Sequence, residues 1–85
     1  MQSNFDPSKD AANRKKHRLA LAEGDGVLND PFALTIEDSA AQGEQRFNSV
    51  GMNGFGQLGV VVHAPRGDNA LIISVRKARP KEVRA

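Results

Sequence analysis

The sequence predicts an α+β fold in which two N-terminal helices pack on a four-stranded, mainly antiparallel sheet, followed by a short C-terminal helical tail. Helix-start signals and basic residues come first in the chain, and β-branched apolar runs separated by short polar segments follow. Because these runs lie close together in the sequence, we expect hairpins rather than crossover connections. The 85 residues leave room for a single domain over residues 1–85.

The first helix is expected over residues 7–17. Asp6 is a good N-cap because its carboxylate accepts from exposed backbone N–H groups, and Pro7 suits the first helical position. The last turn holds the basic residues 14–17, whose charge is favourable at the negative end of the helix dipole. Both ends of this helix are therefore marked in the sequence.

A second, shorter helix is expected over residues 21–28. Gly24 and Gly26 weaken it, because glycine costs up to about 1 kcal/mol relative to alanine inside a helix. Pro31 ends it, because proline lacks the backbone N–H that would continue the helical ladder.

Four apolar or alternating segments after Pro31 are expected to be strands. They cover residues 32–36, 45–50, 58–63 and 70–75, joined by polar or glycine-rich segments at 37–43, 51–56 and 64–69. The basic tail, residues 77–85, is expected to form a short helix that Pro80 interrupts.

Composition excludes several classes of protein. The chain has no cysteine, which removes disulfides, thiolate metal sites and a cysteine nucleophile, and is compatible with the cytoplasmic location that we expect. No apolar run approaches the roughly 18 residues of a membrane span. Charge is unevenly distributed: residues 1–20 carry a net +3, residues 21–45 a net −6 and residues 46–85 a net +5. Such blocks either form a cationic face that attracts a polyanion or mix into an ordinary solvated surface.

Three short motifs suggest functions that their surroundings do not support. The glycines of residues 54–59 match the dinucleotide-binding fingerprint, but a valine-rich strand follows them where the fingerprint requires a helix. Residues 66–68 spell an adhesion tripeptide inside an expected hairpin loop. His17 and His63 stand far apart with no second ligand at helical spacing, so we expect no metal site and no cofactor.

Three further segments, in this order and spacing, carry a family resemblance. They are Phe5-Asp-Pro-Ser-Lys9 continuing through Asn13 to Lys16-His17, then Gly43-Glu44-Gln-Arg46 leading to Gly51, and Ile73-Ser74-Val-Arg76-Lys77-Ala78 with Glu82. The set resembles the BrnT toxins of bacterial type II toxin–antitoxin modules. The chain departs from that pattern by Arg18 in place of glycine, Leu21 in place of phenylalanine, Gly24 and Val75 in place of alanines, and Pro80 in the tail.

This resemblance implies a compact RelE-like fold and a ribonuclease activity that arrests growth. It also implies a cognate BrnA-like antitoxin with a ribbon-helix-helix DNA-binding region, so that the toxin associates with DNA only through the antitoxin. A hetero-oligomer of the two proteins is the expected assembly. A strand edge or an apolar patch near residues 60–62 is where we expect an antitoxin to cover the toxin.

Metal-free RNA cleavage needs a base for the 2′-hydroxyl, an acid for the leaving oxygen and cations for the charged transition state. Arginine suits the last task, and we expect Arg46 and Arg76 to hold the scissile phosphate from two strands. His17 titrates nearest neutral pH and is a candidate acid or base, and Glu44 is a candidate base. Lys16 and Lys77 are expected phosphate contacts.

Each of these roles has a structural alternative. In the structural alternative, Arg46 forms an exposed ion pair with Glu44, the basic residues 14–18 only complete a helix, and His17 has only a structural role. The alternative function is a non-catalytic module, either an RNA binder or a degenerate toxin that only binds antitoxin. A protein adaptor that uses the valine-rich sheet is a third, weaker hypothesis.

Overall fold

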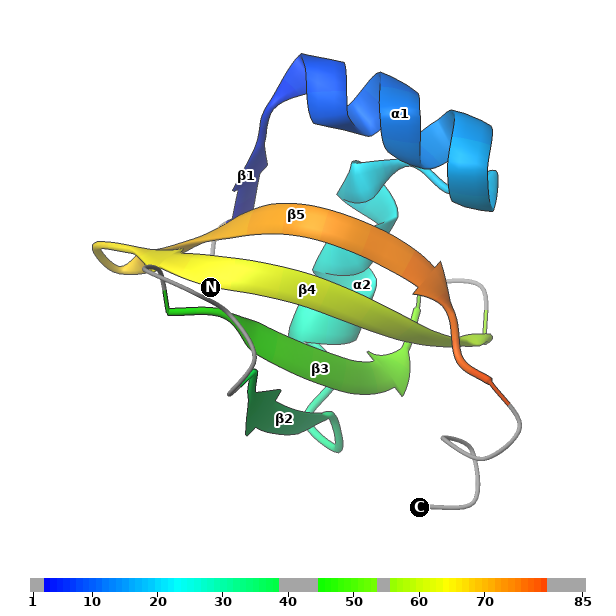
Figure 1. Ribbon diagram of the computed structural model, residues 1–85. Coiled ribbons are helices and arrows are strands. Elements are labelled where there is room, and N and C mark those ends of the chain that lie inside the picture. Colours follow the sequence, from blue (N-terminus) through cyan, green and yellow to red (C-terminus); the bar gives the residue numbers. More distant parts are fainter. Residues whose placement is uncertain (1–2, 39–44, 54–55, 80–85) are drawn as a thin grey trace.

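The computed structural model describes residues 3–38, 45–53 and 56–79, which form a five-stranded sheet and three short helical segments (Figure 1). The elements in chain order are β1 (Ser3–Phe5), α1 (Pro7–His17), the 3₁₀ helix η1 (Leu21–Glu23), α2 (Gly24–Leu28), β2 (Leu34–Glu37), β3 (Phe47–Met52), β4 (Leu58–Arg66) and β5 (Asn69–Lys77). The strand order across the sheet is β1-β5-β4-β3-β2.

The four predicted strands form antiparallel neighbours, as expected, but the sheet has a fifth strand. β1 pairs in parallel with β5, with Ser3 opposite Ala70 and Phe5 opposite Ile72. The prediction of four strands was therefore wrong. β1 has only three residues, which is too short for an alternation of apolar and polar residues to be recognised in the sequence.

The hairpin between β4 and β5 is tighter than predicted. Both strands extend beyond the expected bounds until Arg66 faces Asn69, which leaves a two-residue turn at Gly67 and Asp68. Gly67 has a φ of +61°, a conformation that glycine adopts without the steric cost of a side chain. Pro65 is tolerated inside β4 because β3 begins opposite His63, so this part of β4 is an edge.

The helices have the predicted bounds. The N-cap of α1 is Asp6, whose Oδ1 accepts from the backbone N–H of Ser8 at 2.9 Å. Residues 21–28 divide into η1 and α2. Gly24, which was expected to weaken this helix, is needed there for packing. A Cβ at Gly24 would lie 3.0 Å from a methyl group of Val75, so glycine lets the helix approach the sheet closely.

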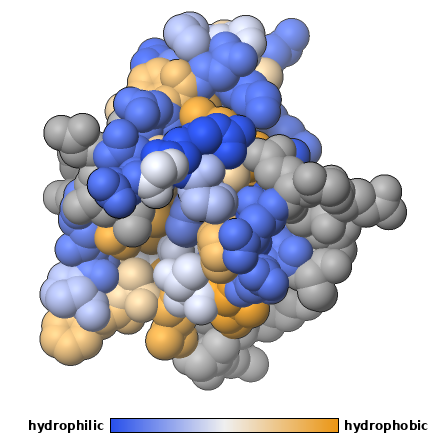
Figure 2. All heavy atoms as spheres, turned by 90° about the vertical axis from the view of Figure 1, so that its left-hand side faces the viewer, coloured by the Kyte–Doolittle hydropathy of each residue, from blue (hydrophilic) through white to orange (hydrophobic). Residues whose placement is uncertain are grey.

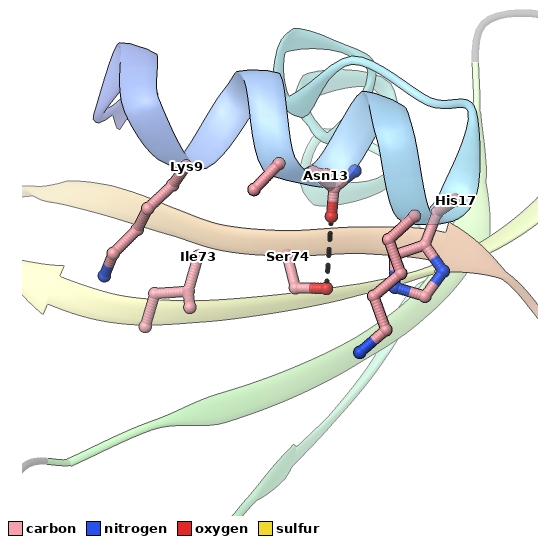
Figure 3. Close-up of a pocket in the computed structure, with 7 residues that line it drawn as sticks. Lys9, Asn13, His17, Ile73 and Ser74 are labelled. Carbon is pink, nitrogen blue, oxygen red and sulfur yellow. Dashed lines mark hydrogen bonds between the residues drawn. The ribbon is translucent and has the colours of Figure 1, made fainter.

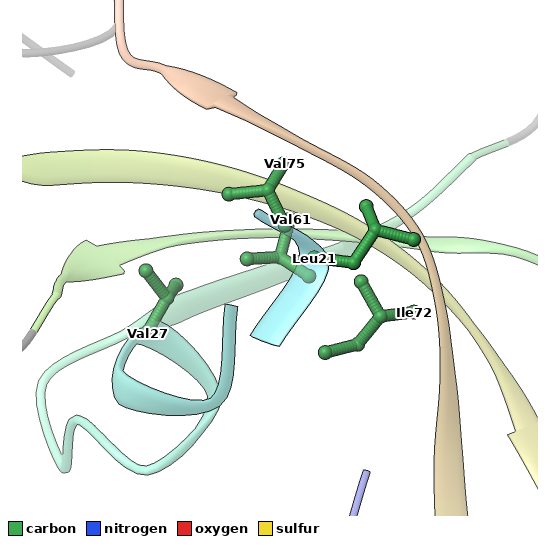
Figure 4. Close-up of a cluster of buried hydrophobic side chains, with 5 residues drawn as sticks. All are labelled: Leu21, Val27, Val61, Ile72 and Val75. Carbon is green, nitrogen blue, oxygen red and sulfur yellow. The ribbon is translucent and has the colours of Figure 1, made fainter. Parts of the chain in front are cut away.

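The hydrophobic core lies between α2 and one face of the sheet (Figure 4). Its buried side chains are Leu21, Val27, Val61, Ile72 and Val75. The expectation of an apolar patch at residues 60–62 was wrong, because β4 lies inside the sheet and Val60 and Val61 are buried. No helix in the described part of the chain is long and apolar enough to cross a membrane.

We call the face of the sheet opposite α2 the far face. Side chains alternate along each strand, so the residues between the core positions point to it. It includes Asn48 and Val50 of β3, Val60 and Val62 of β4, and Ser74 and Arg76 of β5. The predicted helix in the tail falls largely at residues 80–85, outside the described residues.

Candidate active site

Asn13 joins α1 to β5 at the point where β1 no longer pairs with the sheet. Its Nδ2 donates to the carbonyl of Val75 at 2.9 Å, and its Oδ1 accepts from the N–H of the same residue at 3.1 Å. Nδ2 also donates to the carbonyl of Leu19 at 2.8 Å. The amide therefore pairs with the edge of β5 as a neighbouring strand would, and it is only 6% exposed.

A pocket of about 190 Å³ lies between α1 and β5 (Figure 3). Asn13 and Ser74 lie at its centre, where the Ser74 hydroxyl donates to Asn13 Oδ1 at 3.3 Å. Lys9 lies beside Ile73 on one side of Ser74, and His17 lies on the other side (Figure 3). Lys16 also lines the pocket.

The charged side chains that line this pocket are all basic. Among the described residues, its lining includes two lysines and a histidine and no carboxylate. The nearest acidic residue on the helix is Asp10, which forms an ion pair with Arg14 at 3.1 Å. Neither lysine of the pocket forms an ion pair with a described residue.

Arg76 lies on the far face two residues beyond Ser74, roughly 7 Å along the strand. The structure thus brings three predicted residues, Lys16, His17 and Arg76, to one end of the sheet. Arg76 Nη1 donates to the carbonyl of Lys77 at 3.2 Å. Lys77 is exposed at the end of β5 and, by alternation, points to the opposite face from Arg76.

Arg46 shares the far face but not the pocket. It immediately precedes β3, four residues before Val50, and Val50 aligns through Val60 with Arg76. Two strand spacings across and four residues along place the two arginine Cα atoms roughly 16 Å apart. The structure therefore puts both guanidinium groups on one face, with Arg46 two strands away from the α1–β5 pocket.

Arg46 and its neighbour on the same face, Asn48, have polar atoms without partners. Arg46 Nε and Asn48 Oδ1 are buried and have no hydrogen-bond partner among the described residues. A buried donor or acceptor without a partner costs about 1–3 kcal/mol, so such atoms call for an explanation. Glu44, the residue expected to pair with Arg46 or to act as a base, lies outside the described residues.

His63 belongs to a second polar cluster that sequence reasoning missed. On the α2 face, the hydroxyl of Ser49 lies 2.8 Å from His63 Nε2 and 2.7 Å from Thr35 Oγ1. The ring of His63 stacks on Phe47 with 5.8 Å between centroids. Burial lowers the pKa of His63 below its ordinary value of 6.5. The period-two alternation of the segments around Ser49 and His63 was the sequence signal that could have placed both side chains on one face of the sheet.

The described residues contain no group of three histidine, cysteine or acidic side chains that could hold a metal ion. His17 and His63 lie in different pockets, one beside α1 and the other lined by Phe47 and residues of the β4–β5 hairpin.

The fold resembles one known class of protein. It is similar to the crystal structure of the Brucella abortus ribonuclease toxin BrnT, with a TM-score of 0.71 over 93% of this chain and 99% of that one. Sequence identity between the two is 23%, so this likeness concerns the fold. No curated protein matches the chain.

The sequence itself identifies the family. The family model described as "Ribonuclease toxin, BrnT, of type II toxin-antitoxin system" matches residues 5–82. The chain therefore belongs to the BrnT family of ribonuclease toxins, and the resemblance carried by its three sequence segments is confirmed. Membership in a type II system implies a cognate antitoxin.

Proposed function

We propose that this chain cleaves single-stranded RNA without a metal ion, on the far face of the sheet beside α1, and thereby arrests growth. Family membership supports the reaction class. The observation that supports the location is the gathering of Lys16, His17 and Ser74 in one pocket, with Arg76 next along the same strand face.

In the proposed reaction the 2′-oxygen of the substrate attacks the adjacent phosphorus and loses its proton to a base. The P–O5′ bond then breaks, and an acid protonates the leaving oxygen, which gives a 2′,3′-cyclic phosphate and a 5′-hydroxyl end. Arg76 binds the non-bridging oxygens, whose charge grows in the transition state, and a guanidinium group can bond two of them at once. His17 serves as acid or base.

The other predicted residues keep their roles as parts of the proposal. Arg46 and Glu44 act from the β3 side of the far face, with Arg46 binding phosphate oxygens and Glu44 accepting a proton. The charge of Arg46 supports a role in binding, because a guanidinium group can bond two phosphate oxygens at once. Lys16 contacts the phosphate in the pocket, and Lys77 contacts the RNA backbone beyond the end of β5.

The test is cleavage of single-stranded RNA by the purified chain in the presence of a chelator. We expect new 5′-hydroxyl ends at the same rate with and without EDTA, and growth arrest when the chain is produced alone in bacteria. Loss of cleavage in EDTA would contradict metal independence. Salt-sensitive RNA binding without any cleavage product would instead favour the non-catalytic alternative.

The partner in this proposal is a BrnA-like antitoxin with a ribbon-helix-helix region, which binds operator DNA on behalf of a hetero-oligomer in the cytoplasm. The edge strand β2 supports a place for it. Leu34 and Ile36 are 61% and 68% exposed on the far face. Figure 2 shows hydrophobic spheres along the lower edge of the molecule, at the height of β2 in Figure 1.

Backbone pairing and charge favour a protein strand at this edge. The N–H of Asp38 donates to the carbonyl of Arg46 at 2.8 Å, so by alternation the backbone groups of Thr35 and Glu37 point away from β3. Glu37 and Asp38 repel RNA, and they also disfavour a second copy of this edge, which would bring like charges together. A basic, apolar segment of the antitoxin fits instead.

Substitution of Ile36 by lysine tests this placement. Ile36→Lys should weaken binding to the antitoxin encoded beside the toxin by at least tenfold and leave RNA cleavage unchanged. Gln57→Lys adds the same charge at an exposed turn and should leave both unchanged. Equal antitoxin affinity of the Ile36→Lys and Gln57→Lys variants would exclude the β2 edge.

A further inference from the structure

The face of α1 that lines the pocket extends further than the predicted site. Lys9, Asn13, Lys16 and His17 follow one another at helical spacing, so they form a single stripe toward β5. Sequence reasoning gave a role only to the C-terminal end of this stripe. Lys9 stands at its N-terminal end and lines the same pocket (Figure 3).

Lys9 and Lys16 lie at different positions along α1. Lys9 and Lys16 are seven residues apart, which corresponds to about 10 Å of helix axis. The two side chains therefore start from opposite ends of the stripe. Lys16 lies at the end of the stripe nearest Arg76, whereas Lys9 lies beside Ile73, on the other side of Ser74.

Lys9 is also electrostatically available. No ion pair of Lys9 exists within the described ranges. Its nearest acidic neighbour in sequence, Asp10, forms an ion pair with Arg14. Asp6, three residues before Lys9, caps the helix. The backbone hydrogen bond from Ser8 is the main reason why the pKa of Asp6 is lowered, and Lys9 is the smallest contributor. An anion in the pocket would therefore gain the attraction of Lys9 without displacing a partner.

We infer that Lys9 binds the phosphate next to the scissile one, so that the pocket is a subsite for the backbone of a single-stranded RNA. This inference rests on the proposed function, in which Arg76 and Lys16 hold the scissile phosphate. A pocket of about 190 Å³ is smaller than sites that enclose a whole small-molecule ligand, and it suits a segment of a longer strand. Asn13, fixed to β5, sets the distance between the two phosphate positions.

Binding of an RNA that cannot react tests the subsite directly. The probe is a fluorescent 2′-O-methyl oligonucleotide, which lacks the attacking hydroxyl, and the readout is its Kd at several salt concentrations. Lys9→Ala should raise Kd about fivefold and reduce the salt slope of log K by about 0.7, the value for one phosphate contact on a single strand. Lys9→Arg should restore binding.

Lys15→Ala is the matched control. Lys15 lies on the same helix, is exposed, carries the same charge and does not line the pocket. We expect its Kd and salt slope to equal those of the wild type. Equal affinities of the Lys9→Ala and Lys15→Ala variants would overturn the subsite. A loss of antitoxin binding in Lys9→Ala with unchanged RNA affinity would overturn it too and assign the pocket to the protein partner.

Cleavage assays separate this inference from the proposed function. On long single-stranded RNA, Lys9→Ala should raise KM about fivefold at unchanged kcat, because the contact is made equally in the ground and transition states. On a dinucleotide with one phosphodiester, Lys9→Ala and wild type should react alike. If the wild type binds RNA through Lys9 but cleaves none, the proposed function fails and the subsite stands.

Discussion

Arg18 ends α1 in a backbone conformation that suits glycine better than arginine. Its φ is +60°, and its N–H donates to the carbonyl of Arg14 at 2.8 Å in the usual way of a helix C-terminus. A residue with a Cβ loses roughly 1–2 kcal/mol in this left-handed region. Arg18, which departs from the pattern that the sequence resemblance implies, therefore lies at a position where the structure requires a positive φ.

Replacing Arg18 with glycine should stabilise the protein. We expect Arg18→Gly to raise the free energy of unfolding by about 0.5–1 kcal/mol, since relief of strain exceeds the added flexibility of the unfolded chain. Thermal unfolding should shift upward by several degrees. Lys15→Gly, in the interior of the same helix, should instead lower stability by about 1 kcal/mol. A lower melting temperature for Arg18→Gly would contradict the strain at this position.

His63 should make stability depend on pH near neutrality. Its pKa is lowered by burial in the folded state, so between that value and 6.5 the unfolded chain binds more protons than the folded one. Stability contributed by neutral His63 is complete above 6.5 and falls as the pH falls toward the lowered value. Urea unfolding from pH 8 to pH 5 measures this decrease.

The variant His63→Gln should flatten that dependence, because the amide does not titrate and can still bond Ser49. Asp6 and Asp30 do not interfere in this range. Backbone hydrogen bonds lower their pKa values below 3.8, so their contributions disappear only at more acidic pH. An unchanged pH dependence in His63→Gln would place its origin elsewhere.

The elements show why some of the fold was predictable and some was not. The helix at residues 7–17 was predicted within its observed bounds because Asp6, Pro7 and the basic last turn are local signals. β1 has no such signal, since its three residues are strand only because β5 offers an unpaired edge. The extensions of β4 and β5 toward Gly67 likewise depend on the pairing of these two strands with each other. Pro65 made the end of β4 resemble a loop in the sequence.

Asn13 is the connection between elements on which the candidate site depends most. Asn13→Ala leaves the N–H and carbonyl of Val75 and the carbonyl of Leu19 without their partner, which should cost about 2–4 kcal/mol. Chemical denaturation measures this loss. Asn29→Ala removes an exposed amide that bonds only its own helix, and should cost less than about 1 kcal/mol. Similar losses in both variants would contradict the special role of Asn13.

On the scale of the whole molecule, opposite edges of the sheet carry opposite charge. The basic helix α1 lies along β5, and the acidic segment that contains Glu37 and Asp38 forms the β2 edge. The sequence already showed these charges as separate blocks, and the strand order separates them in space. In the proposed function this arrangement places the α1–β5 pocket and the antitoxin edge on opposite sides of the sheet, with Arg46 next to the antitoxin edge.

The candidate site was predictable in part for the same reason. Lys16, His17 and Arg76 lie in the three segments that carry the family resemblance, so the sequence pointed to them. Lys9 gained significance only from the packing of α1 on β5, and Ser49 only from the register that places it beside His63. The distance between Arg46 and Arg76 depends on strand order, which no local pattern specifies.

The most direct test of the account is the rate of RNA cleavage by Arg76→Ala and Arg46→Ala. Each substitution should lower kcat/KM by at least about 100-fold, the effect of removing one transition-state donor, while the melting temperature stays within a few degrees. Arg66→Ala, at the exposed hairpin tip, should cleave like the wild type. Wild-type cleavage rates in folded Arg76→Ala would contradict the proposed site on the far face.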